Sequence, residues 1–346
     1  MSDNIRVGLI GYGYASKTFH APLIAGTPGM MLAAVSSSDA TKVHADWPSV
    51  PVVSEPKHLF NDPNIYLIVI PTPNDTHFPL AKAALEAGKH VIVDKPFTVT
   101  LSQARELDAL AKGLGRLLSV FHNRRWDSDF LTVKTLLSEG TLGEILFFES
   151  HFDRFRPQVR NRWREQAGPG SGIWYDLAPH LLDQAVNLFG LPVSMTVDLA
   201  QLRPGAQTTD YFHAVLSYPQ RRIVLHGTMV AAAESARYII HGTRGSYVKF
   251  GLDPQEDRLK NGERLPQEDW GYDMRDGVVT RVEGEELVEE TLLTMPGNYP
   301  AYYAAIRDAL NGTGENPVPA SQAIQIMELI ELGIESAKHR ATLCLA

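Results

Sequence analysis

The sequence predicts a chain of mixed class, α/β plus α+β. An N-terminal doubly wound parallel sheet of the Rossmann type is expected, followed by a C-terminal domain built on a largely antiparallel open sheet. Short apolar runs alternate with helical patterns over the first third, which is typical of βαβ units. The first run leads directly into a glycine-rich turn. After about residue 121, apolar and polar residues alternate between turn signals, which indicates strands with one covered face.

The first third of the chain contains five apolar runs that predict buried parallel strands. They are rich in Val, Ile and Leu and do not alternate with polar residues, so both faces are expected to be covered. The runs are residues 5–10, 31–36, 66–70, 90–94 and 116–121, with helices expected at 15–25, 76–87 and 101–111. Thr100 and Gln103 predict a capping box at the start of the last of these helices.

The pattern of predicted elements is different in the remainder of the chain. A helix is expected at 127–138, a strand at 145–152 and a helix at 174–189, before alternating strands from 193 to about 293. Turn signals at 218–220 and 242–245 favour antiparallel pairing there. The segment 253–275, rich in Pro, Gly and charge, predicts a long surface loop or hairpin, and helices return at 299–310 and 321–337.

Composition excludes several classes of protein. The 346 residues carry a net charge of −8 with both signs interspersed, a pattern that argues against a nucleic-acid partner. No stretch approaches the ~18 apolar residues that span a bilayer, and the polar start, Met1–Asn4, lacks the features of a signal peptide. The single cysteine, Cys344, cannot form an internal disulfide. We therefore expect a cytoplasmic protein that binds neither nucleic acid nor membrane.

The glycine-rich turn after the first strand predicts a dinucleotide site. Gly11 permits the tight turn, Gly13 lets the backbone approach a pyrophosphate, and the following helix offers N–H groups to it. The third position of the pattern, normally Gly or Ala, is Ser16. A turn that merely connects strand and helix is the alternative. The predicted cofactor-binding residues here are Gly11, Tyr12, Gly13, Tyr14 and Ala15, within a dinucleotide-binding Rossmann domain of residues 1–122.

The end of the second predicted strand bears on the choice of cofactor. An NAD site normally places an acidic residue there for the ribose hydroxyls. This chain has Ser36, Ser37 and Ser38 first, and serines can bind a 2′-phosphate, with Lys42 adding positive charge. The sequence therefore favours NADP. NAD remains the alternative if Asp39 reaches the ribose, and the serines could also simply begin a loop.

Lys95 stands directly after the buried run 90–94 and before Pro96. Ligands of open α/β sheets bind at the carboxyl ends of the strands. Pro96 restricts the backbone of Lys95 to extended values. We interpret Lys95 as a positive charge aimed at a ligand.

A second group of polar residues lies in the predicted helix 174–189. Asp176, His180 and Asp183 are spaced four and three residues apart, so they are expected to share one face. His180 has the titration range for proton transfer, and Asp176 could orient its ring. The alternative is an acidic helix start beside an interface histidine. We expect no metal at this group, because too few ligands can be identified.

Five motifs together carry a resemblance to one family. They are the turn at Gly11–Gly13, the loop Pro71, Thr72, Pro73, Asn74 with His77, the segment 86–90, Asp94-Lys95-Pro96, and Asp176-x-x-x-His180. Over essentially its whole length the chain resembles the Gfo/Idh/MocA family of NAD(P)-dependent oxidoreductases, which includes glucose–fructose oxidoreductase and inositol dehydrogenases. The family more often has Glu at the position of Asp94, a change that keeps the charge.

The resemblance implies roles for these residues. Lys95 corresponds to the catalytic lysine, His180 to the acid or base, and Asp176 to its partner or to a substrate ligand. Hydride transfer between nicotinamide and a carbinol carbon is implied, with Lys95 either stabilising the oxygen or moving the proton itself. Sequence does not separate these two roles.

Further binding residues follow from the same resemblance. Pro71, Thr72, Asn74 and His77 are expected at the nicotinamide end of the cofactor. Asn123 and Asp183 are expected to bind hydroxyls of a sugar or cyclic polyol, within a substrate-binding and oligomerisation domain of residues 123–346. Related proteins dimerise through the sheet of this domain, so we expect a homo-oligomer.

An arginine-rich segment follows the predicted strand 145–152. A lid over substrate or cofactor phosphate is one interpretation, and a solvated loop or subunit contact is favoured for most of its arginines. Arg154, Arg156 and Trp163 are the candidates for the lid. Their pattern is similar to the branch of the family that includes NADP-dependent scyllo-inositol dehydrogenases.

The sequence therefore predicts an NADP-preferring dehydrogenase of an inositol or sugar. An aldose or ketosugar oxidoreductase using NAD is the near alternative. A non-catalytic regulator that binds a dinucleotide is the alternative from another class, but such a protein would be expected to lose Lys95 or His180, and both are present.

Overall fold

The computed structural model of the chain describes residues 4–345; Met1–Asp3, the first residues of the polar N-terminal segment considered above, lie outside the described residues, as does Ala346. The chain forms two compact units, each made of three segments. The first comprises 1–126, 254–270 and 298–324, and the second 127–253, 271–297 and 325–346. The proposed domain boundary at residue 122 remains a prediction. Within residues 4–345, no helix is both long and apolar enough to cross a membrane.

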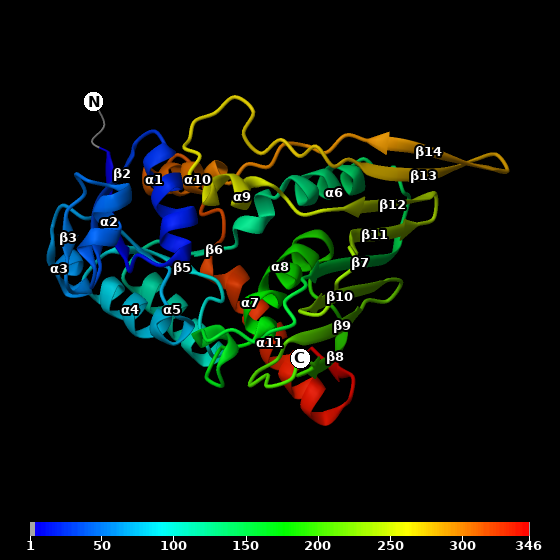
Figure 1. The fold of residues 1–346 in the computed structure, drawn as a ribbon, viewed down its shortest axis with the longest axis horizontal. Helices are drawn as coiled ribbons and strands as arrows, with labels where there is room; N and C mark the ends of the chain where they lie inside the picture. Colours follow the sequence, from blue (N-terminus) through cyan, green and yellow to red (C-terminus); the bar gives the residue numbers. More distant parts are fainter. Residues whose placement is uncertain (1–3, 346) are drawn as a thin grey trace. The chain divides into compact units, whose positions relative to one another are not determined.

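The first unit is built on a parallel sheet of six strands in the order β3-β2-β1-β4-β5-β6 (Figure 1). The interiors of β4 and β5 are buried throughout, as their uninterrupted apolar sequences predict. All the pairs are parallel, so the carboxyl ends of these strands share one edge of the sheet. The strands are β1 Ile5–Ile10, β2 Met30–Ser36, β3 Val52–Val53, β4 Leu67–Ile70, β5 His90–Asp94 and β6 Leu118–Phe121.

Helices of the first unit follow the strands in the expected alternation. The capping box is confirmed: the Thr100 hydroxyl accepts from the Gln103 N–H, and the Gln103 side chain accepts from the Thr100 N–H. The predicted loop at 253–275 is wrong in part, because it contains the helix α9 Gln255–Lys260. The helices are the π-helix η1 Ser16–His20, α1 Ala21–Gly26, α2 Ala40–Asp46, α3 Pro56–Asn61, α4 Asn74–Glu86, α5 Leu101–Gly113, the 3₁₀ turn η2 Asn123–Trp126, α9 and α10 Pro300–Leu310.

The second unit is built on a sheet of nine strands in the order β14-β13-β12-β11-β7-β10-β9-β8-β15. Among its described pairs, β7 with β10 is parallel and the others are antiparallel, so the largely antiparallel sheet is confirmed. The hairpin of β13 and β14 extends beyond the neighbouring strands (Figure 1). The strands are β7 Ile145–Asp153, β8 Ser194–Ala200, β9 Tyr211–Ser217, β10 Arg222–Thr228, β11 Ala236–Gly242, β12 Gly245–Phe250, β13 Gly277–Glu283, β14 Glu286–Leu292 and β15 Leu343–Cys344.

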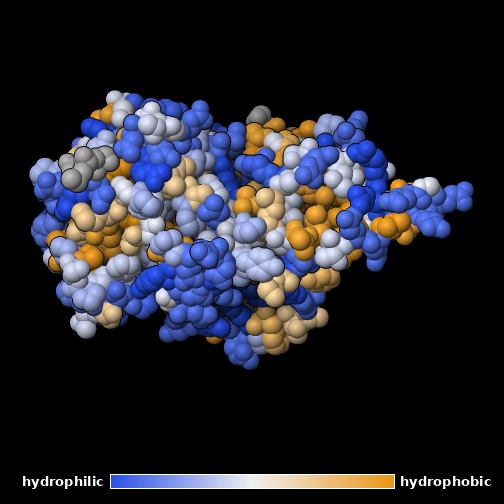
Figure 2. Space-filling model, turned by 90° about the horizontal axis from the view of Figure 1, so that it is seen from above, coloured by the Kyte–Doolittle hydropathy of each residue, from blue (hydrophilic) through white to orange (hydrophobic). Residues whose placement is uncertain are grey.

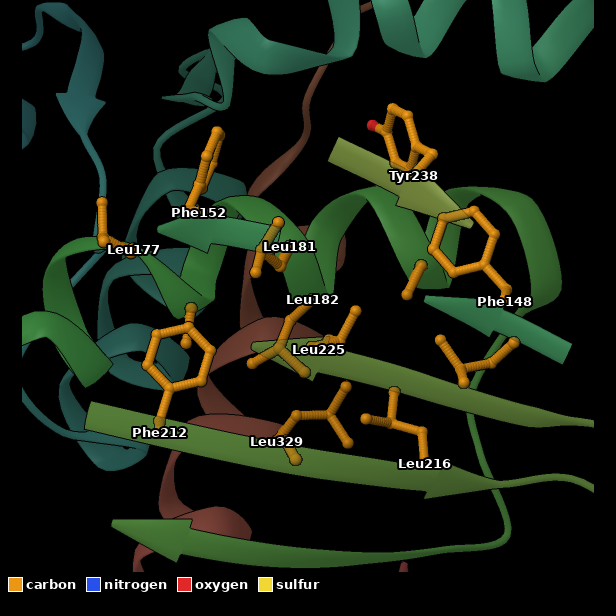
Figure 3. Packing of buried hydrophobic residues seen from close by; sticks show 14 of the residues in the cluster. Phe148, Phe152, Leu177, Leu181, Leu182, Phe212, Leu216, Leu225, Tyr238 and Leu329 are labelled. Atoms are coloured by element: carbon orange, nitrogen blue, oxygen red, sulfur yellow. The ribbon is translucent and has the colours of Figure 1, made fainter. Parts of the chain in front are cut away.

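Helices cover one face of this second sheet. Figure 3 shows Phe148, Phe212 and Leu225 of the sheet packed with Leu181 and Leu182 of the helix α8 Ala178–Phe189, and all are buried. Burying each such side chain contributes about 1.5–3 kcal/mol. Residues that alternate with this core along the strands face the opposite, uncovered side.

The unit also contains α6 Ser128–Ser138, the 3₁₀ turn η3 Trp163–Glu165 and α7 Ile173–Asp176. The helix α11 Ala320–His339 begins in the first unit and ends in the second.

The helix predicted at 174–189 is interrupted, which corrects the sequence analysis. α7 ends at Asp176 and α8 begins at Ala178, with Leu177 between them. Pro179 has no N–H to continue the helical hydrogen bonding from α7, but a proline is well accommodated in the first turn of a new helix. Asp176 is therefore not on the same continuous helix as His180 and Asp183.

The surface seen in Figure 2 is mostly hydrophilic, with hydrophobic residues in separate patches. Isolated exposed apolar residues of this kind are normal for a protein surface.

Candidate active site

The glycine turn after β1 has the conformation that the sequence predicts. Gly11 has a φ of +78°, a region that favours glycine, and its N–H donates to the carbonyl of Ser36 at 2.7 Å. A Cβ added at Gly13 would meet no atom of the described chain within 4 Å. The fold itself therefore does not require a glycine at position 13, whereas a closely approaching ligand would. Ser16, at the third position of the pattern, donates its hydroxyl to the Gly11 carbonyl at 2.9 Å.

Tyr12 and Tyr14 project from this turn and are tied by their hydroxyls. Tyr12 donates to Asp46 at 2.9 Å and Tyr14 to Glu256 at 2.5 Å. Burial, and then the charge of Glu256, raise the pKa of Tyr14 to about 12, so both phenols are neutral donors at physiological pH. Ala15 follows immediately at the start of η1. The turn is thus held by these two side-chain hydrogen bonds as well as by its backbone.

A pocket of about 530 Å³ opens beside the turn, and three lysines line it. Lys17, Lys42 and Lys260 reach it from three separate segments of the first unit. Each is also close to a carboxylate: Lys17 lies 2.9 Å from Asp46, Lys42 3.5 Å from Asp39 and Lys260 3.3 Å from Glu256. An entering phosphate would compete with these carboxylates for the lysines. Lys260 could not be placed here from the sequence, because α9 lies more than 200 residues away along the chain.

Asp39 is used for a structural purpose at the end of β2. Its carboxylate caps α2 by accepting from the N–H groups of Thr41 and Lys42. β2 ends at Ser36, which is buried, and the Ser37 hydroxyl donates to the Asp39 carbonyl at 3.1 Å. Ser38 is exposed. The three serines therefore precede Asp39 at the edge of the sheet. The Asp39 carboxylate is occupied in capping α2.

The loop after β4 is joined to the loop after β5 by His77. This fully buried ring has Nε2 2.9 Å from the Thr72 carbonyl and Nδ1 2.9 Å from the Pro96 carbonyl. Thr72 also accepts a hydrogen bond from the Thr76 hydroxyl at 2.6 Å. Pro71 directly follows β4, and Asn74 is buried at the start of α4. His77 therefore fixes the position of both loops.

Lys95 follows the last residue of β5 and is partly buried. Its N–H donates to Oδ1 of Asp94 at 2.7 Å. Oδ2 of Asp94 lies 3.7 Å from Nε2 of the buried His20, whose Nδ1 is 2.6 Å from the Tyr303 hydroxyl. Burial raises the pKa of Asp94, but hydrogen bonding and charge from His20 and the charge of Lys95 outweigh it, so the pKa lies below its usual value.

This carboxylate and its buried partners hold the backbone at Lys95. His20 and Tyr303 are residues that the sequence analysis missed, since neither belongs to a recognisable motif. Asn123 lies two residues beyond the end of β6 and is buried. The turn after β1, the serines after β2, the loop after β4, Lys95 and Asn123 thus all lie at the carboxyl edge of one parallel sheet.

In the second unit, Asp176 ends α7, and His180 and Asp183 are buried in the first turns of α8. Nε of Arg164 lies 3.4 Å from a carboxylate oxygen of Asp176. The guanidinium of Arg164 also lies 4.5 Å from the ring centre of Trp163. Arg164 therefore contacts a predicted site residue, and the sequence analysis did not single it out.

The arginine-rich loop is anchored by an internal network. The buried Glu165 accepts from the Arg160 N–H and from Arg162, and it lies 3.0 Å from the buried Arg203. Arg203 also donates to Asp210 and to two carbonyls of the loop. Arg154 pairs through its backbone with Thr228 and Ala231. These hydrogen bonds and ion pairs fix the conformation of the loop, so it is not a freely solvated loop.

Comparisons with known proteins cover both units. A family described as "Oxidoreductase family, NAD-binding Rossmann fold" matches residues 5–122. A second, described as "Oxidoreductase family, C-terminal alpha/beta domain", matches residues 134–345. The two matches together span nearly the whole chain.

Individual relatives extend over the same length. The oxidoreductase YdgJ of Escherichia coli (strain K12) is 89% identical over 346 residues, which cover 100% of both chains. The scyllo-inositol 2-dehydrogenase (NADP(+)) IolW of Bacillus subtilis is 38% identical over 345 residues, covering 99% of this chain and 96% of the relative. A solved structure from Yersinia pestis matches with a TM-score of 0.97 at 70% identity, covering 100% of this chain and 98% of that one. Sequence and structure thus agree on one relationship.

Proposed function

The chain belongs to the Gfo/Idh/MocA family of oxidoreductases, and we propose that it is a reversible, NADP-preferring dehydrogenase of a cyclic polyol or sugar. The observation that carries the proposal is Lys95, held at the carboxyl end of β5 on the same sheet edge as the glycine turn. A cation at that edge can stabilise the negative charge that develops on the oxygen of a reacting carbinol.

The residues at this edge fit a dinucleotide. Gly11 and Gly13 leave the backbone open to a pyrophosphate, and the helix that follows them offers N–H groups. Tyr12, Tyr14 and Ala15 are proposed to complete this part of the site. A bound nicotinamide would accept or donate the hydride.

Proton transfer is assigned to a histidine of the second unit. In the direction of oxidation, we assign His180 as the acceptor of the hydroxyl proton while Lys95 donates a hydrogen bond to the same oxygen. Asp176 is proposed to orient His180 or to bind the substrate. Asn123, Asp183, Arg154 and Trp163 are the proposed substrate contacts, and Pro71, Thr72, Asn74 and His77 the proposed surroundings of the nicotinamide.

Three observations support NADP over NAD. Asp39 is committed to capping α2, so it is poorly placed to bind ribose hydroxyls. Ser36, Ser37 and Ser38 precede it and do not repel a 2′-phosphate, while Lys17 and Lys42 line the neighbouring pocket. The relative from Bacillus subtilis with 38% identity is named for NADP(+) and for scyllo-inositol. The name of that relative also favours an inositol among the possible substrates.

A panel assay tests the proposal. Nicotinamide absorbance is followed with NADP and NAD across inositol isomers and common aldoses and ketoses. Turnover of an inositol with a higher kcat/KM for NADP than for NAD is expected. Turnover restricted to aldoses with NAD would replace the substrate assignment. Tight cofactor binding without any turnover would identify a regulator and overturn the proposal.

The role of Lys95 is tested by Lys95→Met, which keeps the length of the side chain and removes the charge. A loss of kcat by about 100- to 1,000-fold is expected, with cofactor affinity nearly unchanged. Lys112→Met, at an exposed ion pair on α5, is the matched control. If Lys95 and His180 act on one substrate oxygen, combining Lys95→Met with His180→Asn should cost much less than the product of the single losses. Full turnover by Lys95→Met would contradict the assignment.

Cofactor choice is tested by Ser37→Asp. A carboxylate at the end of β2 would repel a 2′-phosphate and accept ribose hydroxyls, so the ratio of kcat/KM for NADP to that for NAD should fall at least about 10-fold. An unchanged ratio would place the discrimination elsewhere.

Self-association through the uncovered face of the nine-stranded sheet is a further part of the proposal. Phe147, Val215, Val224 and Ile239 alternate with core residues and face that side. Apolar residues in the middle of an open sheet face favour coverage by another surface. Light scattering should give a multiple of the chain mass, and Val224→Lys should lower it.

A further inference from the structure

The uncovered face of the nine-stranded sheet carries a row of histidines. His151 on β7, His226 on β10 and His213 on β9 are paired in register across three neighbouring strands. Their neighbours along the strands, Phe152 and Phe212, belong to the core on the other face, so the histidines point away from it. The ring of His226 lies 5.0 Å from that of His151 and 5.9 Å from that of His213, between ring centres.

Asp153 connects two of these rings. Its Oδ1 lies 2.7 Å from Nδ1 of His226, and its Oδ2 lies 3.0 Å from Nδ1 of His151. One ligand atom from each of the three residues lies within 4.8 Å of the others. The three side chains are only 8–16% exposed, so they are largely shielded from water.

We propose that His151, Asp153 and His226 form a binding site for a divalent transition-metal ion, with Zn²⁺ as the best-suited ion. Two imidazole nitrogens and one carboxylate oxygen are a ligand set that Zn²⁺ accepts. Tetrahedral bonds of about 2.0–2.2 Å place such ligand atoms roughly 3.3 Å apart. The two Asp153 oxygens lie 2.7 and 3.0 Å from the histidine nitrogens, which is about 0.3–0.6 Å shorter than that spacing. Binding would release the protons that the rings now share with Asp153.

Glu149 lies behind one of the proposed ligands. Nε2 of His151 lies 2.7 Å from a carboxylate oxygen of Glu149. With Zn²⁺ in place of the proton that Nδ1 now directs at Asp153, the Nε2–H of His151 would donate to Glu149, which is the carboxylate–histidine pairing found behind metal-bound histidines.

The strands fix the geometry of this site. All three ligands stand on the neighbouring strands β7 and β10, whose backbones are hydrogen-bonded in register. Three protein ligands leave a fourth position open on the side away from the sheet. None of these residues takes part in the proposed hydride transfer. The metal site and the proposed dehydrogenase activity are therefore tested independently of each other.

Titration calorimetry with Zn²⁺ tests the proposal directly. The full-length chain, without a histidine tag and stripped with EDTA, is titrated with ZnCl₂. Saturable binding of one Zn²⁺ per chain is expected, and His226→Asn should weaken it at least about 10-fold. His241→Asn is the matched control, since His241 is an exposed histidine of the same sheet that hydrogen-bonds to Ser246 outside the group.

Two further measurements keep the test independent of folding defects in the variants. Glu149→Gln should weaken Zn²⁺ binding while leaving the ligands in place, and circular dichroism reports whether each variant is folded. Co²⁺ bound to the unmodified chain should show the visible absorption of a low-symmetry tetrahedral or five-coordinate ion. Lack of saturable Zn²⁺ binding by the unmodified chain, or equal affinity in a folded His226→Asn variant, would overturn the proposal.

Discussion

The two sheets of this chain place their polar groups in different positions. In the six-stranded parallel sheet, the interiors of β4 and β5 are entirely apolar, and polar residues such as Ser36 and Lys95 come at or just after the strand ends. In the nine-stranded sheet, His151 and His226 lie within the strands, on the uncovered face. Helices on both faces leave a parallel sheet only its edge for chemistry, whereas a sheet covered on one side can carry polar groups along its whole open face.

The comparison implies that polar groups on a covered face must be fully paired. The substitution that tests this has the largest expected effect on stability. Arg237 on β11 is buried on the helical side of the nine-stranded sheet, where it donates to Asp129 at 2.8 Å and to Ser150 and Gln184. Asp129→Ala would leave the guanidinium without its counter-charge. We expect a loss of about 3–5 kcal/mol in the free energy of unfolding, measured by urea denaturation.

The matched control lies on the exposed hairpin of the same sheet. Arg281 and Glu290 form an ion pair between β13 and β14, with the side chains 39% and 59% exposed. Glu290→Ala should leave the free energy of unfolding nearly unchanged, because water solvates the remaining charge. Equal effects of the two substitutions would show that the covered and uncovered parts of this sheet do not differ in the way proposed.

A second prediction concerns a histidine in the parallel sheet, at the start of β5. His90 is 8% exposed, and its Nδ1 accepts a hydrogen bond from the Leu117 N–H at 2.8 Å. Burial, and then the charge of Arg116, lower its pKa to about 4. The unfolded chain, with a histidine pKa near 6.5, binds more protons between pH 6.5 and 4, so stability should fall by about 2–3 kcal/mol as the pH drops through this window.

His90→Asn isolates this contribution. The Asn carbonyl can accept the same backbone N–H but does not titrate, so the stability of the variant should depend less steeply on pH between 6.5 and 4 than that of the unmodified chain. Urea denaturation at closely spaced pH values measures the difference, since other titrating groups contribute equally to both proteins. Parallel curves would mean that His90 titrates normally in the folded state.

The same contrast explains how much could be predicted from the sequence. The strand at His90–Asp94 was predicted with its bounds, because an apolar run buried on both faces ends where the sheet ends. The glycine turn and Lys95 were located because the chemistry of a parallel sheet gathers at strand ends, which are visible in the sequence.

Other features depend on pairing between distant segments. The histidine row requires the register of β7 with β10, which are separated by about 70 residues and pair in parallel within an otherwise antiparallel sheet. The Arg164–Asp176 contact and Lys260 beside the glycine turn also come from tertiary structure. The helix break at Leu177, in contrast, has a local cause. Pro179 is visible in the sequence, but the prediction of one continuous helix overlooked that proline lacks the N–H needed to continue the hydrogen bonding.

The smallest expected effect concerns a helix start in the first unit, where local sequence decides the structure. The Thr100 hydroxyl accepts from the Gln103 N–H at 3.3 Å, and the Gln103 side chain accepts from the Thr100 N–H at 3.4 Å. Thr100→Ala removes the first bond and should cost about 1 kcal/mol of stability, while Thr100→Ser keeps the acceptor and should cost much less. Urea denaturation of the three proteins measures this. If Ser and Ala destabilised the chain equally, the methyl group of Thr100 and not its hydroxyl would hold α5, and packing would govern even this exposed start of a helix.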